Sequence, residues 1–411
     1  MPSIDLITPT APIATPTHGG RAKCLQRLVR LDLPVPSTVA LSFDVVKSVA
    51  AGHMPDIDAI LNQFSSEDIL CVRPSSESAD WGGPSAILNI GMNDARFVEL
   101  SDKLGQEAAV DLYLRFVQSY SINVARLDPD AFEHIEGQDQ AALAAALHAY
   151  HEETGEEFPQ RISDQLTEVL RSMSRAWEGT TARLLREAKG APADAGLGLV
   201  VQKMAFGIGL GESGSGVLQL VDGNTGVERI MGRYARQSQG RDALEQHSNA
   251  LFLAHDPRGP SLEDSEPEIF AKLVEQAELM RHRLREEMQI EFTIQNGELF
   301  ILDGVRVSRR ANAAMRIAVK LAEDGIIPQQ EALMRIDPRA LGELFIAKSM
   351  QMQNAIFWRL LLRPVRGLLV VKLCLMRLRR RHMRHAGNPV FWSVVKPVLK
   401  TFVACTPQQV C

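Results

Sequence analysis

Glycine dominates one ten-residue segment of the chain, 207–216, which reads GIGLGESGSG. Within it, Gly209, Gly211 and Gly214 match the GxGxxG spacing, which binds a dinucleotide pyrophosphate when a strand precedes it and a helix follows. Here a second strand-like run, 217–222, follows the glycines, and this argues against a dinucleotide fold. A glycine flap between two strands fits better, because backbone N–H groups without side chains can cover phosphates. A hairpin tip that binds nothing is the alternative.

Two carboxylates fall on a predicted hairpin. Runs of alternating polar and apolar residues flank Asn296-Gly297, a dipeptide typical of a type I′ turn. Glu291 lies in the first run and Asp303 follows the second, so we expect the two side chains to lie close across the hairpin. Mg²⁺ takes one or two carboxylates together with phosphate oxygens. A metal site at Glu291 and Asp303 is one interpretation, and a solvated strand face is the other.

An arginine ends another apolar run. Residues 69–72 predict a buried strand, and Arg73 follows them at the start of the polar loop 74–84. A guanidinium in this position can hold a phosphate through two parallel hydrogen bonds. A surface salt bridge is the alternative.

The elements that position these residues follow from the apolar spacing. Helical periodicity predicts helices at 22–33, through most of 95–190, and at 269–287, 311–324 and 328–335. Strand-like runs lie at 39–43, 69–73, 197–206, 217–222, 289–294 and 298–302. The predicted fold class is α+β.

The composition is that of a globular protein, with 45% hydrophobic and 23% charged residues. No charge-free run of 18 apolar residues and no leading basic-apolar segment occurs, so neither a membrane span nor a signal peptide is predicted. The five Cys residues show no zinc-binding spacing, which predicts a reducing, cytoplasmic location.

Six segments resemble the pyruvate phosphate dikinase family, in the same order as in that family. They are 19–36 (opening with GGRA where the family has GGKG), 72–93 (VRPSSESADWGGPSAILNIGMN), 152–159 (EETGEEFP), 201–216 (VQKMAFGIGLGESGSG), 232–240 and 288–310. Together they cover about residues 19–345.

The resemblance implies a two-lobed ATP-grasp fold and a reaction class. In the family, ATP phosphorylates a histidine on a separate swivelling domain, and a barrel domain passes the phosphate to pyruvate to give phosphoenolpyruvate. The expected organisation is a disordered N-terminus (1–18), a first lobe (19–95), a helical insert (96–190), lobes with flap and metal hairpin (191–310), a helical linker (311–345) and a basic tail (346–411).

The resemblance implies the candidate site, with ATP and Mg²⁺ as cofactors. Catalytic roles fall to Arg21, Arg73 and Asp303, and metal ligation to Glu291 and Asp303. Nucleotide contacts fall to Arg21, Arg73, Gln202, Gly207, Gly209, Gly211, Gly214, Gly216 and Glu291. The expected partners are ATP and the family's phosphohistidine and phosphoenolpyruvate/pyruvate domains, with neither nucleic acid nor membrane.

Several positions depart from the family pattern. Arg21 stands where the family has Lys, Gln289 replaces an Asp, Arg233 replaces a Glu, and Asp303-Gly304-Val305 replaces Gln-Thr-Arg. Arg and Lys are not interchangeable at a phosphate, and a lost transition-state charge contact costs roughly 3–4 kcal/mol. Nucleotide binding is therefore expected to persist, while the chain alone is expected to be inactive in phosphoryl transfer.

The last 66 residues, 346–411, differ sharply in composition, with 12 Lys/Arg and no Asp or Glu. Read one base out of frame, permitted codons for 388–411 encode SCILVRRETSPEDIRGMHAAAGV, which resembles the family segment preceding its phosphorylated histidine. The tail is therefore interpreted as a frameshift product beginning near residue 346. The alternative is that the tail forms a basic membrane-surface helix or a nucleic-acid-binding patch. With a membrane-surface helix, the chain would be a degenerate nucleotide-binding regulatory module associated with a membrane.

Overall fold

A computed structural model describes residues 3–137, 139–240 and 250–336, together with the backbone of four short strands between 372 and 401. The chain divides into two units, 1–335 and 336–411. In the second unit, β11 (Lys372–Met376) pairs with β14 (Pro397–Thr401), and β12 (Met383–His385) pairs with β13 (Asn388–Val390). The frameshift interpretation of 346–411 otherwise concerns residues outside those described.

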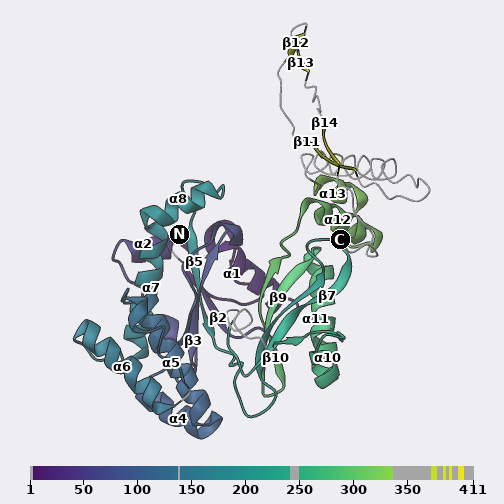
Figure 1. Ribbon diagram of the computed structural model, residues 1–411. Helices are drawn as coiled ribbons and strands as arrows, with labels where there is room; N and C mark the ends of the chain where they lie inside the picture. Colours follow the sequence, from purple (N-terminus) through teal and green to yellow (C-terminus); the bar gives the residue numbers. More distant parts are fainter. Residues whose placement is uncertain are drawn as a thin grey trace, which may run out of the picture. The chain divides into compact units, whose positions relative to one another are not determined.

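The first sheet of unit 1 is antiparallel and has the strand order β1-β2-β5-β3-β4. Its strands are β1 (Ile4–Leu6), β2 (Thr38–Leu41), β3 (Leu70–Ser76), β4 (Ile87–Ile90) and β5 (Leu197–Lys203). The central strand β5 reads as a continuous apolar run because it is covered on both faces, and six of its seven residues are buried. Figure 1 shows β2, β3 and β5 between α1 (Thr15–Val29) and the helices of the 95–190 segment.

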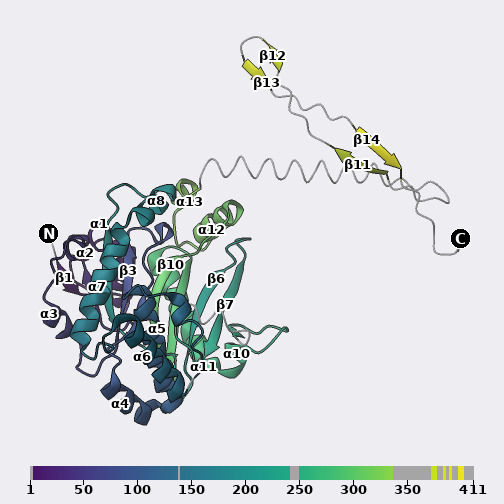
Figure 2. The same cartoon turned by 60° about the vertical axis from the view of Figure 1, so that its left-hand side comes forward.

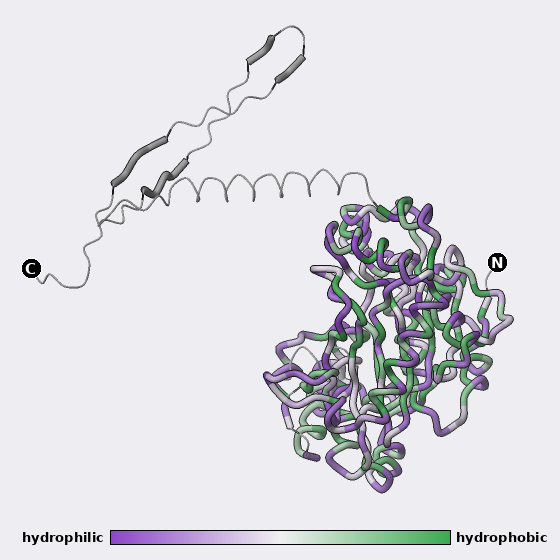
Figure 3. Tube along the Cα trace, turned by 90° about the vertical axis from the view of Figure 1, so that its right-hand side faces the viewer, coloured by the Kyte–Doolittle hydropathy of each residue, from purple (hydrophilic) through white to green (hydrophobic). Residues whose placement is uncertain are grey.

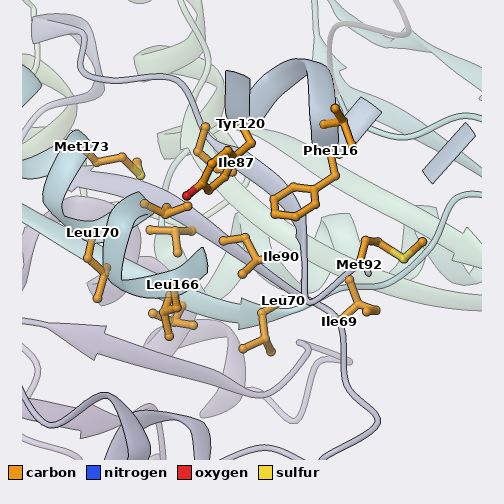
Figure 4. Close-up of a cluster of buried hydrophobic side chains, with 14 of the residues drawn as sticks. Ile69, Leu70, Ile87, Ile90, Met92, Phe116, Tyr120, Leu166, Leu170 and Met173 are labelled. Atoms are coloured by element: carbon orange, nitrogen blue, oxygen red, sulfur yellow. The ribbon is translucent and has the colours of Figure 1, made fainter. Parts of the chain in front are cut away.

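Helices cover the other face of this sheet. They are α2 (Phe43–Ala50), α3 (Ile57–Leu61), α4 (Asp94–Leu104), α5 (Gln106–Asn123), α6 (Gln140–Thr154), α7 (Ile162–Glu178) and α8 (Thr180–Ala188), with 3₁₀ turns η1 (Ala79–Trp81) and η2 (Pro129–Ala131). The apolar face of α5 includes Phe116 and Tyr120, which pack with Leu166 and Leu170 of α7 over Ile87 (Figure 4). The helical prediction for 95–190 is confirmed.

The second sheet is also antiparallel and has the order β10-β9-β6-β7-β8. Its strands are β6 (Gly214–Val221), β7 (Glu228–Arg236), β8 (Leu251–Phe252), β9 (Met288–Gln295) and β10 (Glu298–Arg306). The predicted β9–β10 hairpin is confirmed, and Asn296 and Gly297 both have positive φ, as a type I′ turn requires. Helices α10 (Leu262–Ser265) and α11 (Pro267–Leu284) follow β8, and α11 contacts β9 and β10.

Helix α1 joins the two sheets. Its residues Leu25 and Leu28 are fully buried in a core that includes Val200 of the first sheet and Ile290 and Ile301 of the second. Both α12 (Ala311–Glu323) and α13 (Gln329–Met334) lie at one end of the second sheet in Figures 1 and 2. In Figure 3 the hydrophobic stretches concentrate along the inner strands of unit 1, whereas hydrophilic stretches gather on the outer loops.

The α+β class is confirmed, and the N-terminus differs from the sequence prediction. Residues 1–18 were predicted to be disordered, whereas Ile4–Leu6 form β1 and pair with β2. Burial of Ile7 and Ile13 and a hydrogen bond between Ser3 Oγ and His18 Nε2 (3.0 Å) hold the segment against the sheet. Among the described residues, no helix combines the length and apolar character needed to cross a membrane.

Candidate functional site

A cavity of about 300 Å³ lies between the two sheets of unit 1. The first sheet contributes Cys71, Arg73, Gln202 and Lys203, and the second contributes Ser215, Gly216, Val217, Glu291 and Thr293. Helix α1 contributes Arg21, while Ser85, Leu88, Gln239 and Gly240 come from β4 and from loops. A concave site of this size, with a few convergent polar groups, suits a small-molecule ligand.

Strand pairing brings the two predicted metal ligands together. Asp303 of β10 lies directly opposite Glu291 of β9, so the expectation that they lie close across the hairpin is confirmed. Glu291 also pairs with Val217 of β6. Its side chain is 16% exposed and lines the cavity, and Thr293 is buried, so the solvated-face alternative is wrong.

Four charged side chains meet at one wall of the cavity. Arg21 Nε donates to Asp303 Oδ2 at 2.6 Å, and Arg73 Nη2 donates to Glu291 Oε2 at 2.5 Å. The same Arg73 nitrogen lies 3.8 Å from Asp303 Oδ2, which links the two pairs. Arg73 is 11% exposed, so it forms a largely buried ion pair rather than the surface salt bridge considered from sequence.

The protonation states of this cluster follow from competing effects. Burial alone would raise the pKa of Asp303, but the charges of Arg21 and Arg73 outweigh burial and lower this pKa. Burial alone would lower the pKa of Arg73, but the Glu291 and Asp303 carboxylates outweigh it and raise that pKa. Asp303 is therefore ionised and Arg73 protonated at neutral pH.

Two further cavity residues are neutral. Gln202 is buried and its Nε2 donates to Thr38 Oγ1 at 2.9 Å, which fixes its amide within the first sheet. Burial raises the pKa of the Cys71 thiol to about 11, so it remains protonated at neutral pH. Cys71 was not among the predicted site residues, although it lies two residues before Arg73 on β3 and therefore shares its strand face.

The glycine flap contributes less to the cavity than the sequence suggested. It connects β5 to β6, which confirms the strand–loop–strand arrangement, but of its predicted contact residues only Gly216 lines the cavity. The loop is held against the β9–β10 turn, where Gly211 N donates to Asn296 Oδ1 at 3.2 Å. A Cβ at Gly207 would lie 1.8 Å from the Ser238 carbonyl oxygen. Close packing therefore accounts for glycine at position 207.

The carboxylates fit one metal-binding position better than two. No cluster of three or more His, Cys, Asp or Glu side chains suited to a metal ion occurs in the described ranges. Asp303 is fully buried, does not line the cavity, and its Oδ1 accepts a hydrogen bond from Gly304 N at 2.8 Å. Glu291 lines the cavity, and its Oε1 accepts no hydrogen bond from the residues described. Glu291 therefore fits a Mg²⁺ ion shared with ligand phosphates, and Asp303 fits the role of an arginine partner.

The chain has relatives among curated proteins. It is 30% identical over 295 residues to the pyruvate, phosphate dikinase of Clostridium symbiosum, covering 67% of this chain and 33% of that protein. The protein of the same name from Rhizobium meliloti is 30% identical over 300 residues, with the same coverage. Pyruvate, phosphate dikinase 2 of Oryza sativa subsp. japonica is 26% identical over 360 residues, covering 79% of this chain and 40% of the relative.

These relatives confirm the resemblance carried by the motifs. The chain is similar to the pyruvate, phosphate dikinases over about two thirds of its own length, and it spans about a third of the length of the first two relatives. No protein-family model matches it.

Proposed function

We propose that unit 1 is the ATP-binding part of a pyruvate, phosphate dikinase-like phosphotransferase, built as an ATP-grasp fold. One observation carries the proposal. Arg21, Arg73, Gln202 and Glu291 lie in four segments that resemble the family, far apart in sequence, and all four line the same cavity. A chance resemblance of separate segments would not make their polar residues converge on one site.

The cavity suggests how the nucleotide would be held. Ligand phosphates would approach the wall formed by Arg21, Arg73 and Glu291. Mg²⁺, when bound at Glu291, would neutralise part of the phosphate charge. Gln202 would supply a polar contact from the first sheet, and Leu88 an apolar one.

The rest of the reaction is assigned by analogy with the relatives. In a complete enzyme the phosphate would pass to a histidine on another domain and then to pyruvate. No segment of residues 1–411 resembles that histidine motif. The chain by itself is therefore expected to bind ATP without forming phosphoenolpyruvate.

A second candidate is a nucleotide-binding regulatory module that does not transfer phosphate. The Arg21–Asp303 ion pair favours it, because this pair occupies a cation that would otherwise stabilise phosphate. Phosphoenolpyruvate formation by the chain mixed with the separate histidine and barrel domains of a relative would exclude this second candidate.

Calorimetry on the full chain tests the primary proposal. We expect ATP to bind more tightly with Mg²⁺ than without, and Glu291→Gln to abolish this difference while the fold is retained. Glu275→Gln, on the exposed face of α11, is the matched control and should behave as wild type. An absence of heat with ATP in both conditions would refute nucleotide binding. A Mg²⁺ effect that survives Glu291→Gln would refute the metal assignment.

A further inference from the structure

Among the residues that the structure describes, each cation that lines the cavity already has a carboxylate partner within the protein. The lining cations are Arg21, Arg73 and Lys203. Arg21 pairs with Asp303 at 2.6 Å, Arg73 with Glu291 at 2.5 Å, and Lys203 Nζ with Asp68 Oδ1 at 2.8 Å. The described part of the cavity lining therefore offers an anionic ligand little uncompensated positive charge.

We propose that Asp303 is a specificity-determining residue, which holds Arg21 away from ligand phosphates so that the site recognises the nucleoside part of its ligand. The ligand class is then adenine nucleosides and nucleotides, bound with little dependence on phosphate number when Mg²⁺ is absent. This inference rests on the proposed function, because it concerns the same cavity.

The geometry of Arg21 shows how firmly it is held. Its Nε donates to Asp303 Oδ2, and its Nη1 donates to the carbonyl of Pro74. Two sides of the guanidinium group are therefore turned towards the protein, and the side chain is 21% exposed. A phosphate that entered the cavity would have to share the charge of Arg21 with the Asp303 carboxylate, which is already at hydrogen-bond distance.

Losing the ion pair with Arg21 would be energetically unfavourable for Asp303. Its side chain is 1% exposed, and its other oxygen is occupied by the N–H of Gly304. If Arg21 turned to a phosphate, Asp303 would remain as a buried charge with only Arg73, 3.8 Å away, to compensate it. Breaking one side of a buried ion pair is strongly unfavourable, so the phosphate contact gains little net free energy.

Arg73 is held in a similar way. Its Nη1 donates to the Leu302 carbonyl at 2.8 Å, and its Nη2 donates to Glu291. The two arginines and two carboxylates sum to no net charge. The phosphates of a metal-free triphosphate would therefore meet Glu291 without a free cation from the described lining to offset it. Affinity should then depend on contacts to the nucleoside and not on the length of the phosphate chain.

Calorimetry on the full chain in Mg²⁺-free buffer, with adenosine, ADP and ATP as probes, tests this. The wild type is expected to bind all three with dissociation constants within about threefold of one another. Asp303→Asn keeps the side-chain size and an acceptor for Gly304 but frees the Arg21 charge. It should tighten ATP binding by about tenfold or more, as expected for a charge-assisted contact, and leave adenosine unchanged.

The double variant Arg21→Gln/Asp303→Asn separates Arg21 from other effects. The gain in ATP affinity should disappear in it, because the freed cation is gone. Asp256→Asn removes another buried aspartate that is paired with arginine, outside the cavity, and should change no affinity.

The outcomes are distinct. Wild-type affinity that rises steeply from adenosine to ATP, or an Asp303→Asn variant that matches wild type, would overturn the inference and leave nucleotide binding intact. Failure of all three probes to bind, with or without Mg²⁺, would instead remove the proposed function. The wild-type series requires no variant, so it decides the inference even if Asp303→Asn folds poorly.

Discussion

Asp303 faces Glu291 only because a β-bulge shifts the register of the β9–β10 hairpin. Up to Ile301 the hairpin is regular, and the shift between Ile301 and Asp303 leaves Leu302 unpaired. Without the bulge, Leu302 would lie opposite Glu291. The Leu302 carbonyl, released from the ladder, accepts the hydrogen bond from Arg73 Nη1. One extra residue in β10 thus supplies both the second carboxylate and an acceptor for Arg73.

The stability of unit 1 should depend on pH through Asp303. Its folded-state pKa is lowered, so its contribution is present above the ordinary Asp value of about 3.9 and is lost as pH falls through the folded-state pKa. At pH 7 we expect Asp303→Asn to lower the free energy of unfolding by roughly 2 kcal/mol. This is less than for a fully buried pair because Arg21 is partly exposed.

Denaturant unfolding of wild type and Asp303→Asn between pH 7 and pH 3 measures this effect. The difference between them should be constant down to about pH 4 and shrink below it. Asp102→Asn, at an exposed position on α4, is the control and should match wild type throughout. A difference that grows on acidification would contradict the sign of the pKa change.

Local patterns predicted many of the helices and strands of unit 1 and failed to predict its electrostatics. The Asn296-Gly297 turn and the helical spacing in 95–190 depend on neighbouring residues, and both predictions are confirmed. The Arg21–Asp303 pair joins residues 282 positions apart, so no local pattern could show that a candidate phosphate ligand is already paired.

The glycines of the flap, 207–216, also show that a local sequence pattern does not reveal contacts with residues far away in the chain. A run of glycines in sequence is compatible with phosphate binding and with close packing, and only the packing partners distinguish them. Those partners, Ser238 and Asn296, lie 31 or more residues from Gly207 and were not visible in the motif. The β1 strand was missed for a related reason, since its pairing depends on β2, more than 30 residues away.

Gly207→Ala should destabilise unit 1. The added Cβ would meet the Ser238 carbonyl oxygen at 1.8 Å and Ser215 Oγ at 2.7 Å, so the β6–β7 region would have to shift. Overpacking of this kind costs about 1–3 kcal/mol. Gly83→Ala, where the nearest atom is a Pro74 carbon at 3.5 Å, is the control. Equal melting temperatures for the two variants would show that the flap is held less tightly than the contacts indicate.

Phe158, within the family-like segment 152–159, should be a stability residue. Its ring contacts Phe116, Tyr120 and Tyr150 edge-on, with centroids 5.5, 5.3 and 5.2 Å away, and it is 3% exposed. Phe158→Ala should lower the free energy of unfolding by about 3–5 kcal/mol. Val98→Ala, at a 61% exposed position of α4, should have little effect. A loss of ATP affinity in Phe158→Ala without loss of stability would assign the segment to the ligand instead.

Cys71 provides a chemical probe of the cavity. Because burial raises its pKa to about 11, the reactive thiolate is scarce at neutral pH, and alkylation by iodoacetamide should be slow at pH 7.5. The rate should rise about tenfold per pH unit between pH 7.5 and 9.5, as the thiolate fraction does. Mg-ATP should slow the alkylation of Cys71, since the thiol lines the cavity.

Cys24 is the internal control for the alkylation of Cys71. Burial raises the pKa of the Cys24 thiol to about 12, and this residue lies outside the cavity, with its Sγ donating to the Gly304 carbonyl. Peptide mapping by mass spectrometry follows both sites in one reaction. Rapid alkylation of Cys71 at pH 7.5 would contradict its raised pKa. Equal protection of Cys24 and Cys71 by Mg-ATP would show that the nucleotide does not occupy the cavity beside Arg73.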